Sequence, residues 1–242
     1  LRKRTPQSLV STFMGAHARP KEFNSNADYL LYLEKKILPQ VEGLASFQDI
    51  FCEKGYFTEA ETVSLLKAGK KFGLLPKVHA HEFGRTGGVR AAVKVNAISA
   101  DHLMSLDESD IQLLAQSKVI PVLLPGSSFF LGAKSFAPAR RMWDAGLKVA
   151  IASDFNPGTN PSQNFPLFGT MAAIFQGLSL EEVLCAQTLH GALALNLHDR
   201  GTLEPGMRAD FIAWDYEHFE EIYYSYGSSR VISVYLGGKK VL

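Results

Sequence analysis

The sequence predicts an α/β fold, a TIM-like (β/α)8 barrel with strands 3–8 present, followed by a short β-type segment. Apolar segments rich in β-branched residues alternate with amphipathic segments over residues 1–200, which indicates parallel strands joined by right-handed crossovers. Six strand units can be counted there, and polar residues follow most of them, as at the mouth of a barrel. Because a closed barrel needs eight strands and the chain begins at Leu1 rather than Met, we expect the first two strands in an amino-terminal part that this sequence lacks.

An open, doubly wound sheet would also accommodate six strands. Members of that class that bind nucleotides carry a Gly-x-Gly-x-x-Gly turn or a Walker loop after a strand, and neither pattern occurs in this sequence. The barrel is therefore the favoured interpretation.

Hydrophobic periodicity and breaker residues set the expected elements. Strands are predicted at residues 8–16, 47–53, 76–82, 97–99, 119–124 and 149–152. Helices are predicted at residues 26–41, 59–72, 89–95, 107–117, 137–145, 165–176 and 179–197. Asn26 or Asp28 is expected to cap the first helix. Capping boxes are predicted to open two later helices, at Thr58 with Glu61 and at Ser179 with Glu182.

A second unit is predicted from residue 201 onward. Residues 201–215 and 231–242 are turn-rich and β-patterned, and no helix is expected between them. Residues 1–200 are thus assigned to a barrel portion that carries the active site, and residues 201–242 to a β-type carboxyl-terminal segment.

Composition indicates an ordinary globular chain of 242 residues, with 46% apolar and 11% aromatic residues. The formal net charge of +1 provides no broad attraction to nucleic acid or to membrane surfaces, so the expected ligand is a small molecule. No segment has the pattern of a membrane span or a signal peptide, and a cytoplasmic location is expected. Cys52 and Cys185 lie in hydrophobic segments and are expected to be free, buried thiols.

Titratable side chains gather at the ends of the predicted strands: His17, Glu53, His79, His81, Glu82, Asp101, His102 and Asp154. In a barrel those ends meet at one mouth, where residues distant in sequence surround a single ligand. Imidazole and carboxylate groups that leave one position open suit a divalent metal, which generates hydroxide at neutral pH. The sequence therefore predicts a metal site that activates water.

Most of these residues also have a structural interpretation. His17 suits a hydrogen-bonded structural role as well as a ligand role, and Glu53 and Asp101 suit supporting or strand-capping roles better than catalysis. His79 and His81 differ by two and so share a strand face, although twist at the strand end would leave only one of them on the ligand. Helix or surface roles are assigned to three other histidines: His190, His198 and His218.

Four sequence blocks carry a family resemblance. They run from Gly15 to Ala18, His79 to Glu82, Ser99 to Leu103, and Ser153 to Thr159. In this order they resemble the imidazolonepropionase family, a group of the amidohydrolase superfamily that acts in histidine degradation. The segment from Gly201 to Ile212 is similar to the superfamily's return from its barrel to a small β-sandwich. The resemblance covers essentially the whole chain.

The resemblance implies a barrel of the metal-dependent hydrolase type with one divalent metal, Zn²⁺ or Fe²⁺. His79 and Asp154 match the family's metal ligands. The catalytic positions match Glu82, His102 and Asp154, and Glu82 also matches the residue that hydrogen-bonds the imidazolone ring. The other substrate-binding positions match His17, Asn156, Gly158 and Thr159. His81 matches no ligand in this pattern.

The implied reaction opens the cyclic amide 4-imidazolone-5-propanoate to N-formimidoyl-L-glutamate. Ring opening needs a hydroxide, a polarised carbonyl and a proton for the departing nitrogen. Asp154 would take the proton, while Glu82 and His102 would steer the ring and its carbonyl. A homodimer is expected because relatives tend to form one.

Two alternatives remain open. A sibling enzyme acting on another cyclic amide or on an aminated ring would carry similar residues. The family's first-strand His-x-His pair does not occur in this sequence, nor do the early arginine and tyrosine that bind the substrate carboxylate. A fragment without catalytic activity is therefore the other interpretation.

Overall fold

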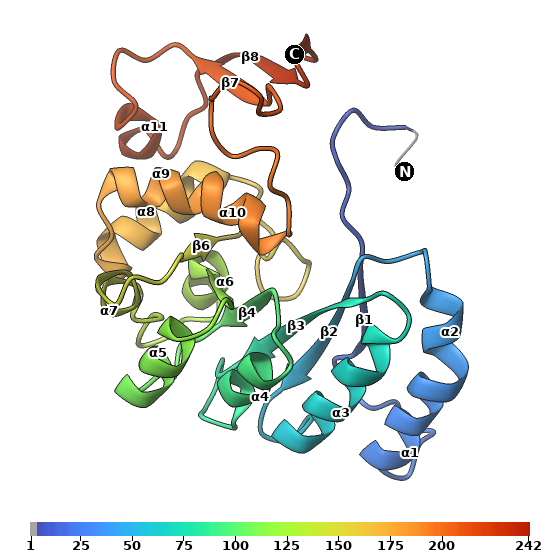
Figure 1. The fold of residues 1–242 in the computed structure, drawn as a ribbon. Coiled ribbons are helices and arrows are strands. Elements are labelled where there is room, and N and C mark those ends of the chain that lie inside the picture. Colours follow the sequence, from blue (N-terminus) through green and yellow to red (C-terminus); the bar gives the residue numbers. More distant parts are fainter. Residues whose placement is uncertain (1–3) are drawn as a thin grey trace. The chain divides into compact units, whose positions relative to one another are not determined.

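The computed structural model describes residues 4–242, and the charged start of the chain from Leu1 to Lys3 lies outside the described residues. The chain forms two compact units (Figure 1). The amino-proximal unit comprises residues 10–122 and 141–147, and the carboxyl-proximal unit comprises residues 4–9, 123–140 and 148–242.

Parallel strands and flanking helices alternate through the amino-proximal unit, as the sequence predicts. The strands are β1 (Thr12–Ala16), β2 (Phe47–Cys52), β3 (Leu75–Ala80), β4 (Ser99–His102) and β5 (Ile120–Leu123). Each strand pairs in parallel with the next one along the chain. The helices are α1 (Asn26–Tyr32), η1 (Leu33–Ile37), α2 (Leu38–Val41), α3 (Glu59–Lys70), α4 (Gly88–Lys94), α5 (Glu108–Ala115) and α7 (Ala139–Asp144).

The two faces of this sheet differ in chemistry. On one face, small and branched side chains such as Val78 and Ala80 are fully buried, and α3 and α4 lie along β2 and β3 (Figure 1). Gly88 of α4 allows this close approach, because a Cβ at that position would lie 2.6 Å from the Cβ of Ala80. Strand alternation and the β2–β3 register place Asp49 and His79 on the opposite face. That face carries the titratable groups.

Helix boundaries follow the predicted capping chemistry with two corrections. Thr58 and Glu61 form the predicted capping box at the start of α3. The first helix is capped by Ser25, which accepts from the backbone amide of Asp28, so the predicted caps were wrong by one position or more. The helical elements α1, η1 and α2 follow one another directly and together span the predicted residues 26–41, but the middle turn, η1, is π-helical rather than α-helical.

The carboxyl-proximal unit is mostly helical and ends in a small antiparallel sheet. It contains α6 (Pro125–Phe130), β6 (Ala150–Ile151), α8 (Phe165–Gln176), α9 (Leu180–Gln187), α10 (Leu189–Ala194), β7 (Phe211–Trp214), α11 (Glu221–Tyr224), β8 (Val231–Leu236) and β9 (Lys239–Lys240). The last three strands pair in the order β7-β8-β9. The predicted boundary near residue 200, between the barrel portion and the β-type carboxyl-terminal segment, stays a prediction.

Two expectations for this unit were wrong. The helix predicted at residues 179–197 starts with the expected capping box of Ser179 and Glu182 but breaks at Thr188, whose φ of −115° and ψ of −84° are not helical. A short helix, α11, also lies between the β-patterned segments, where none was expected.

Cys52 is buried and Cys185 half-buried, and both are free thiols. Among the described residues, no helix is both long and apolar enough to cross a membrane.

Candidate metal-binding and active site

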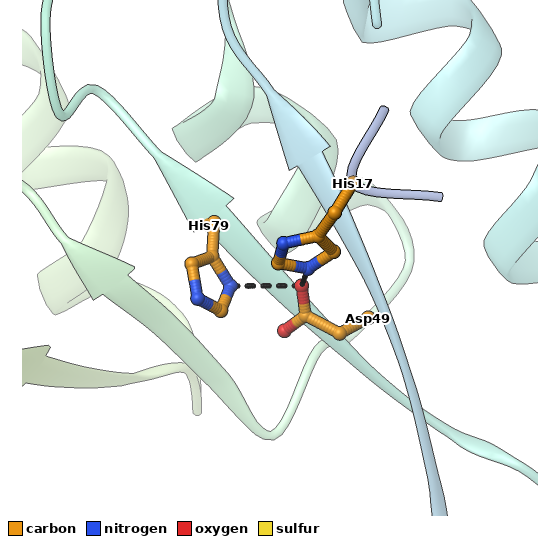
Figure 2. Close-up of side chains that lie close together, drawn as sticks. All are labelled: His17, Asp49 and His79. Carbon is orange, nitrogen blue, oxygen red and sulfur yellow. Dashed lines mark hydrogen bonds and ion pairs between the residues drawn. The ribbon is translucent and has the colours of Figure 1, made fainter. Parts of the chain in front are cut away.

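Three adjacent strands of the amino-proximal unit bring His17, Asp49 and His79 together (Figure 2). His17 directly follows β1, Asp49 lies inside β2, and His79 lies near the end of β3. Nε2 of His17 and Nδ1 of His79 each lie 2.8 Å from the same oxygen, Oδ1 of Asp49. The two imidazole rings meet edge to face, with centroids 4.6 Å apart.

The shared carboxylate is ionised. Burial of Asp49, whose exposed fraction is 1%, acts to raise its pKa, but the two imidazoles and their hydrogen bonds outweigh burial and hold that pKa well below its usual range. An ionised carboxylate can only accept hydrogen bonds. Oδ1 of Asp49 thus accepts a hydrogen bond from Nε2 of His17 and forms a close ion-pair contact with Nδ1 of His79.

His102 and Glu82 extend this cluster. The ring of His102, the last residue of β4, lies 5.2 Å from the His79 ring, centroid to centroid. Burial, followed by the neighbouring His79, lowers the pKa of His102 to about 3, so this ring is neutral at pH 7. Oε2 of Glu82 lies 3.7 Å from Nε2 of His102. A carboxylate and a neutral imidazole thus face the same position beside His79.

Left-handed backbone occurs where these strands end. His81, His102 and Asp154 have φ values of 55°, 74° and 50°. Such a conformation is costly for residues other than glycine and clusters at functional sites. At His81 it ends the alternation of β3, and this ring lies 3.7 Å from Asp110 of α5 rather than beside Asp49. Only His79 of the predicted pair joins the cluster.

Glu53 and Asp101 hold backbone and side chains in place. The Glu53 carboxylate accepts from the amides of Lys54 and Phe83, and the second bond fixes the loop that carries Glu82. Asp101 accepts from the hydroxyl of Ser99. The supporting roles predicted for these two carboxylates stay predictions, and these hydrogen bonds are of the kind that such roles require.

The remaining predicted site residues form a second group, in the carboxyl-proximal unit. Asp154 accepts from the hydroxyl of Ser127 at 2.5 Å and from that of Thr159 at 3.4 Å. Oδ1 of Asn156 accepts from the amides of Gly158 and Thr159, at 2.9 and 2.8 Å. These bonds hold the turn from Asn156 to Thr159 in its conformation. The predicted site therefore divides into two groups: His17, His79, Glu82 and His102 in one unit, and Asp154, Asn156, Gly158 and Thr159 in the other.

Sequence reasoning missed Asp49 and Ser127. A signal for Asp49 existed, because it stands in the middle of Phe47-Gln-Asp-Ile-Phe-Cys52, where a carboxylate needs a buried partner. For Ser127 the signal was weaker. It follows the Pro125-Gly126 pair after a strand, where a polar residue is common.

The donor atoms of His17, Asp49 and His79 are of the chemical types that bind a divalent cation. One ligand atom each from His17, Asp49 and His79 lies within 4.8 Å of the others. Imidazole nitrogen with carboxylate oxygen is the donor set of catalytic zinc and of non-haem iron.

Known proteins resemble this chain along its whole length. The family model described as "Amidohydrolase family" matches residues 41–240. An imidazolonepropionase of Geobacillus kaustophilus is 42% identical over 241 residues, which cover 98% of this chain and 57% of that protein. The imidazolonepropionase of Christiangramia forsetii is 41% identical and covers 100% of this chain and 60% of its own length. The chain thus spans little more than half the length of these relatives.

Solved structures share the fold at lower identity. An adenosine deaminase from Xanthomonas campestris with bound zinc superposes with a TM-score of 0.79 at 19% identity, covering 100% of this chain and 62% of its own. The A. niger ochratoxinase superposes with a TM-score of 0.71 at 18% identity, covering 94% of this chain and 59% of its own. These likenesses confirm the predicted barrel-type α/β fold. Because the family model spans most of its residues, the chain belongs to the amidohydrolase family.

Proposed function

We propose that the protein carrying this chain hydrolyses 4-imidazolone-5-propanoate to N-formimidoyl-L-glutamate, a step of histidine degradation. The observation that carries the proposal is the 42% identity to an imidazolonepropionase over 98% of this chain, a span that includes both groups of site residues. The neutral His102 beside the Glu82 carboxylate adds chemical support, since hydrolysis of a cyclic amide needs a proton carrier and a hydrogen-bonding group at one place.

His79 and Asp154 are the proposed ligands of one divalent metal, Zn²⁺ or Fe²⁺. When bound, such an ion acts as a Lewis acid that lowers the pKa of water and polarises a carbonyl. The zinc of the Xanthomonas campestris relative supports a metal here but not the identity of the ion.

The chain's own side chains provide the proton movements. Asp154 takes the proton that the attacking water loses, and this proton then passes by way of Oε2 of the Glu82 carboxylate to the departing ring nitrogen, so that both carboxylates end ionised. His102 stays neutral and directs Nε2 toward the substrate carbonyl, for which it needs a hydrogen at that atom. His17 and the turn formed by Asn156, Gly158 and Thr159 bind the substrate. Removal of one acid–base group typically lowers the rate about 10²- to 10⁴-fold.

Another cyclic amidohydrolase or a ring deaminase is the second candidate. The solved relatives that share the fold include an adenosine deaminase and triazine hydrolases, which act on other substrates. Their identities of 16–19% are far below the 42% of the imidazolonepropionase, and this difference favours the imidazolone substrate.

We further propose a cytoplasmic homodimer that binds neither nucleic acid nor membrane.

The decisive experiment is an assay of imidazolone ring opening by the complete protein, with Zn²⁺ or Fe²⁺ added, in which N-formimidoyl-L-glutamate is measured by mass spectrometry. We expect metal-dependent turnover that falls about 10²- to 10⁴-fold in Asp154→Asn. Asp215→Asn is the matched control, because that carboxylate is exposed and pairs only with Arg230 among the described contacts. Metal-loaded protein that leaves the imidazolone intact, or an Asp154→Asn variant with full activity, would contradict the proposal.

A further inference from the structure

We propose that Asp49 is a positioning residue that fixes the hydrogen positions of His17 and His79 at once, and so aims Nε2 of His79 at the metal and Nδ1 of His17 at the substrate. The inference rests on the proposed function for the identity of the ligands. The arrangement of the three side chains is independent of it.

The geometry of the three side chains provides a shared acceptor. Both imidazoles approach the same oxygen of Asp49 at 2.8 Å, which is an ordinary hydrogen-bond length for a nitrogen donor and a carboxylate oxygen. Asp49 lies inside β2 and pairs with Lys77 of β3, while the pairing of β2 with β1 is irregular beside it. The two histidines therefore share one acceptor that is carried by a strand of the sheet.

The same carboxylate determines which nitrogen of each ring carries a hydrogen. Because a carboxylate oxygen lies 2.8 Å from Nδ1 of His79, the hydrogen of a neutral His79 ring is placed on Nδ1 and the lone pair on Nε2, the atom that points away from Asp49 (Figure 2). The carboxylate accepts from Nε2 of His17, so a neutral His17 ring has its lone pair on Nδ1. One carboxylate thus selects opposite tautomers in two neighbouring rings. Histidines that bind metals commonly donate their second N–H to such an acceptor, which fixes the ring orientation.

A competing arrangement would have the three side chains bind a cation directly. That would require His79 to use Nδ1 and His17 to use Nε2, the two atoms that already lie 2.8 Å from Oδ1 of Asp49. A cation would have to displace both hydrogens from a carboxylate oxygen that they already satisfy. The positioning role needs no such rearrangement, and the two arrangements differ in which nitrogen of His79 carries a proton.

The test uses the complete protein and its Asp49→Asn variant, with Zn²⁺ as the probe. Metal affinity is measured by competition with a chelator, and the tautomer of His79 by ¹⁵N NMR of histidine-labelled, metal-free protein. We expect Nδ1–H at His79 in the unaltered protein, and a Zn²⁺ affinity about 10- to 100-fold weaker in the variant at unchanged stoichiometry. Asp110→Asn is the matched control, since this buried carboxylate pairs with Arg85 and should leave Zn²⁺ affinity unchanged.

Asp49→Glu provides a second variant that keeps the carboxylate, and it should recover part of the lost affinity. The NMR measurement needs no variant of Asp49, so it decides the question even if Asp49→Asn does not fold. A proton on Nε2 of His79 in the unaltered protein, or an Asp49→Asn affinity equal to that of the unaltered protein, overturns the inference. Loss of a whole equivalent of Zn²⁺ in Asp49→Asn also overturns it, because Asp49 would then be a ligand. If these readouts agree with expectation but the imidazolone stays intact, only the proposed function fails.

Discussion

Oε2 of Glu82 lies 3.7 Å from Nε2 of His102, and both side chains are largely withdrawn from solvent, with exposed fractions of 10% and 5%. This separation is too long for a hydrogen bond. The pKa of His102, lowered to about 3 mainly by burial, means that the neighbouring carboxylate does not face a charged imidazole at neutral pH. Glu82 and His102 thus lie close together without a hydrogen bond or a charge pair between them at neutral pH.

Replacing Glu82 with Gln should lower kcat about 10²- to 10⁴-fold, because the amide cannot carry a proton to the departing nitrogen. Steady-state kinetics of imidazolone ring opening measure the effect. The control is Glu59→Gln on α3, where the carboxylate forms a surface ion pair with Arg90. A Glu82→Gln variant with unchanged kcat would remove Glu82 from the chemistry.

Replacing His17 with Gln should raise KM about 3- to 10-fold with a smaller change in kcat, since one hydrogen bond to bound substrate is worth about 0.5–1.5 kcal/mol. His198→Gln is the control, because His198 is exposed and contacts only Asn196 among the described hydrogen bonds. If His17→Gln instead lowered kcat at constant KM, His17 would act on the transition state and not on substrate binding.

The repeating α/β architecture could be predicted because each element has a local signal. Capping boxes at Thr58 and Ser179 mark helix starts, and apolar runs bounded by turn residues mark strands. The break at Thr188 had no such signal, since the residues on both sides of it have helical periodicity. Strand-end histidines could be identified from position. Asp49 could be recognised as a buried carboxylate in need of a partner, but not as the partner of these histidines, because adjacency between β1, β2 and β3 is a tertiary property. Whether His79 or His81 joins the cluster likewise depends on the left-handed backbone at His81, which no residue type predicts.

Replacing Gly88 with Ala should lower the free energy of unfolding by about 1–3 kcal/mol, the usual cost of overpacking. The added methyl would lie 2.6 Å from the Cβ of Ala80 and 3.1 Å from its Cα, so α4 would have to move away from β3. Gly227→Ala is the matched control, because nothing lies within 4 Å of its added Cβ. Urea denaturation of both variants measures the difference, and equal stabilities would contradict the tight contact between α4 and β3.

His190 of α10 should make stability depend on pH. Its buried ring donates from Nδ1 to the carbonyl of Val149 at 2.9 Å, and Nε2 faces Sγ of Cys185 at 3.5 Å. Burial lowers its pKa below the ordinary 6.5, the bond to Val149 opposes this, and the charge of Lys148 adds to the lowering. Below pH 6.5 the unfolded chain thus binds more protons at this site than the folded chain does. The resulting contribution to stability is complete above pH 6.5 and is lost as pH falls through that value toward the folded pKa.

We therefore expect a His190→Asn variant to lose less stability than the unaltered protein between pH 8 and pH 5. The asparagine amide can still donate to the Val149 carbonyl, so the comparison isolates protonation from the loss of that hydrogen bond. Urea denaturation at both pH values gives the four free energies of unfolding that are needed. His198→Asn, which alters an exposed histidine, should keep the pH dependence of the unaltered protein. If His190→Asn also keeps the pH dependence of the unaltered protein, the loss of stability in acid arises at other titratable groups. Burial of the neutral His190 ring then contributes little to that loss.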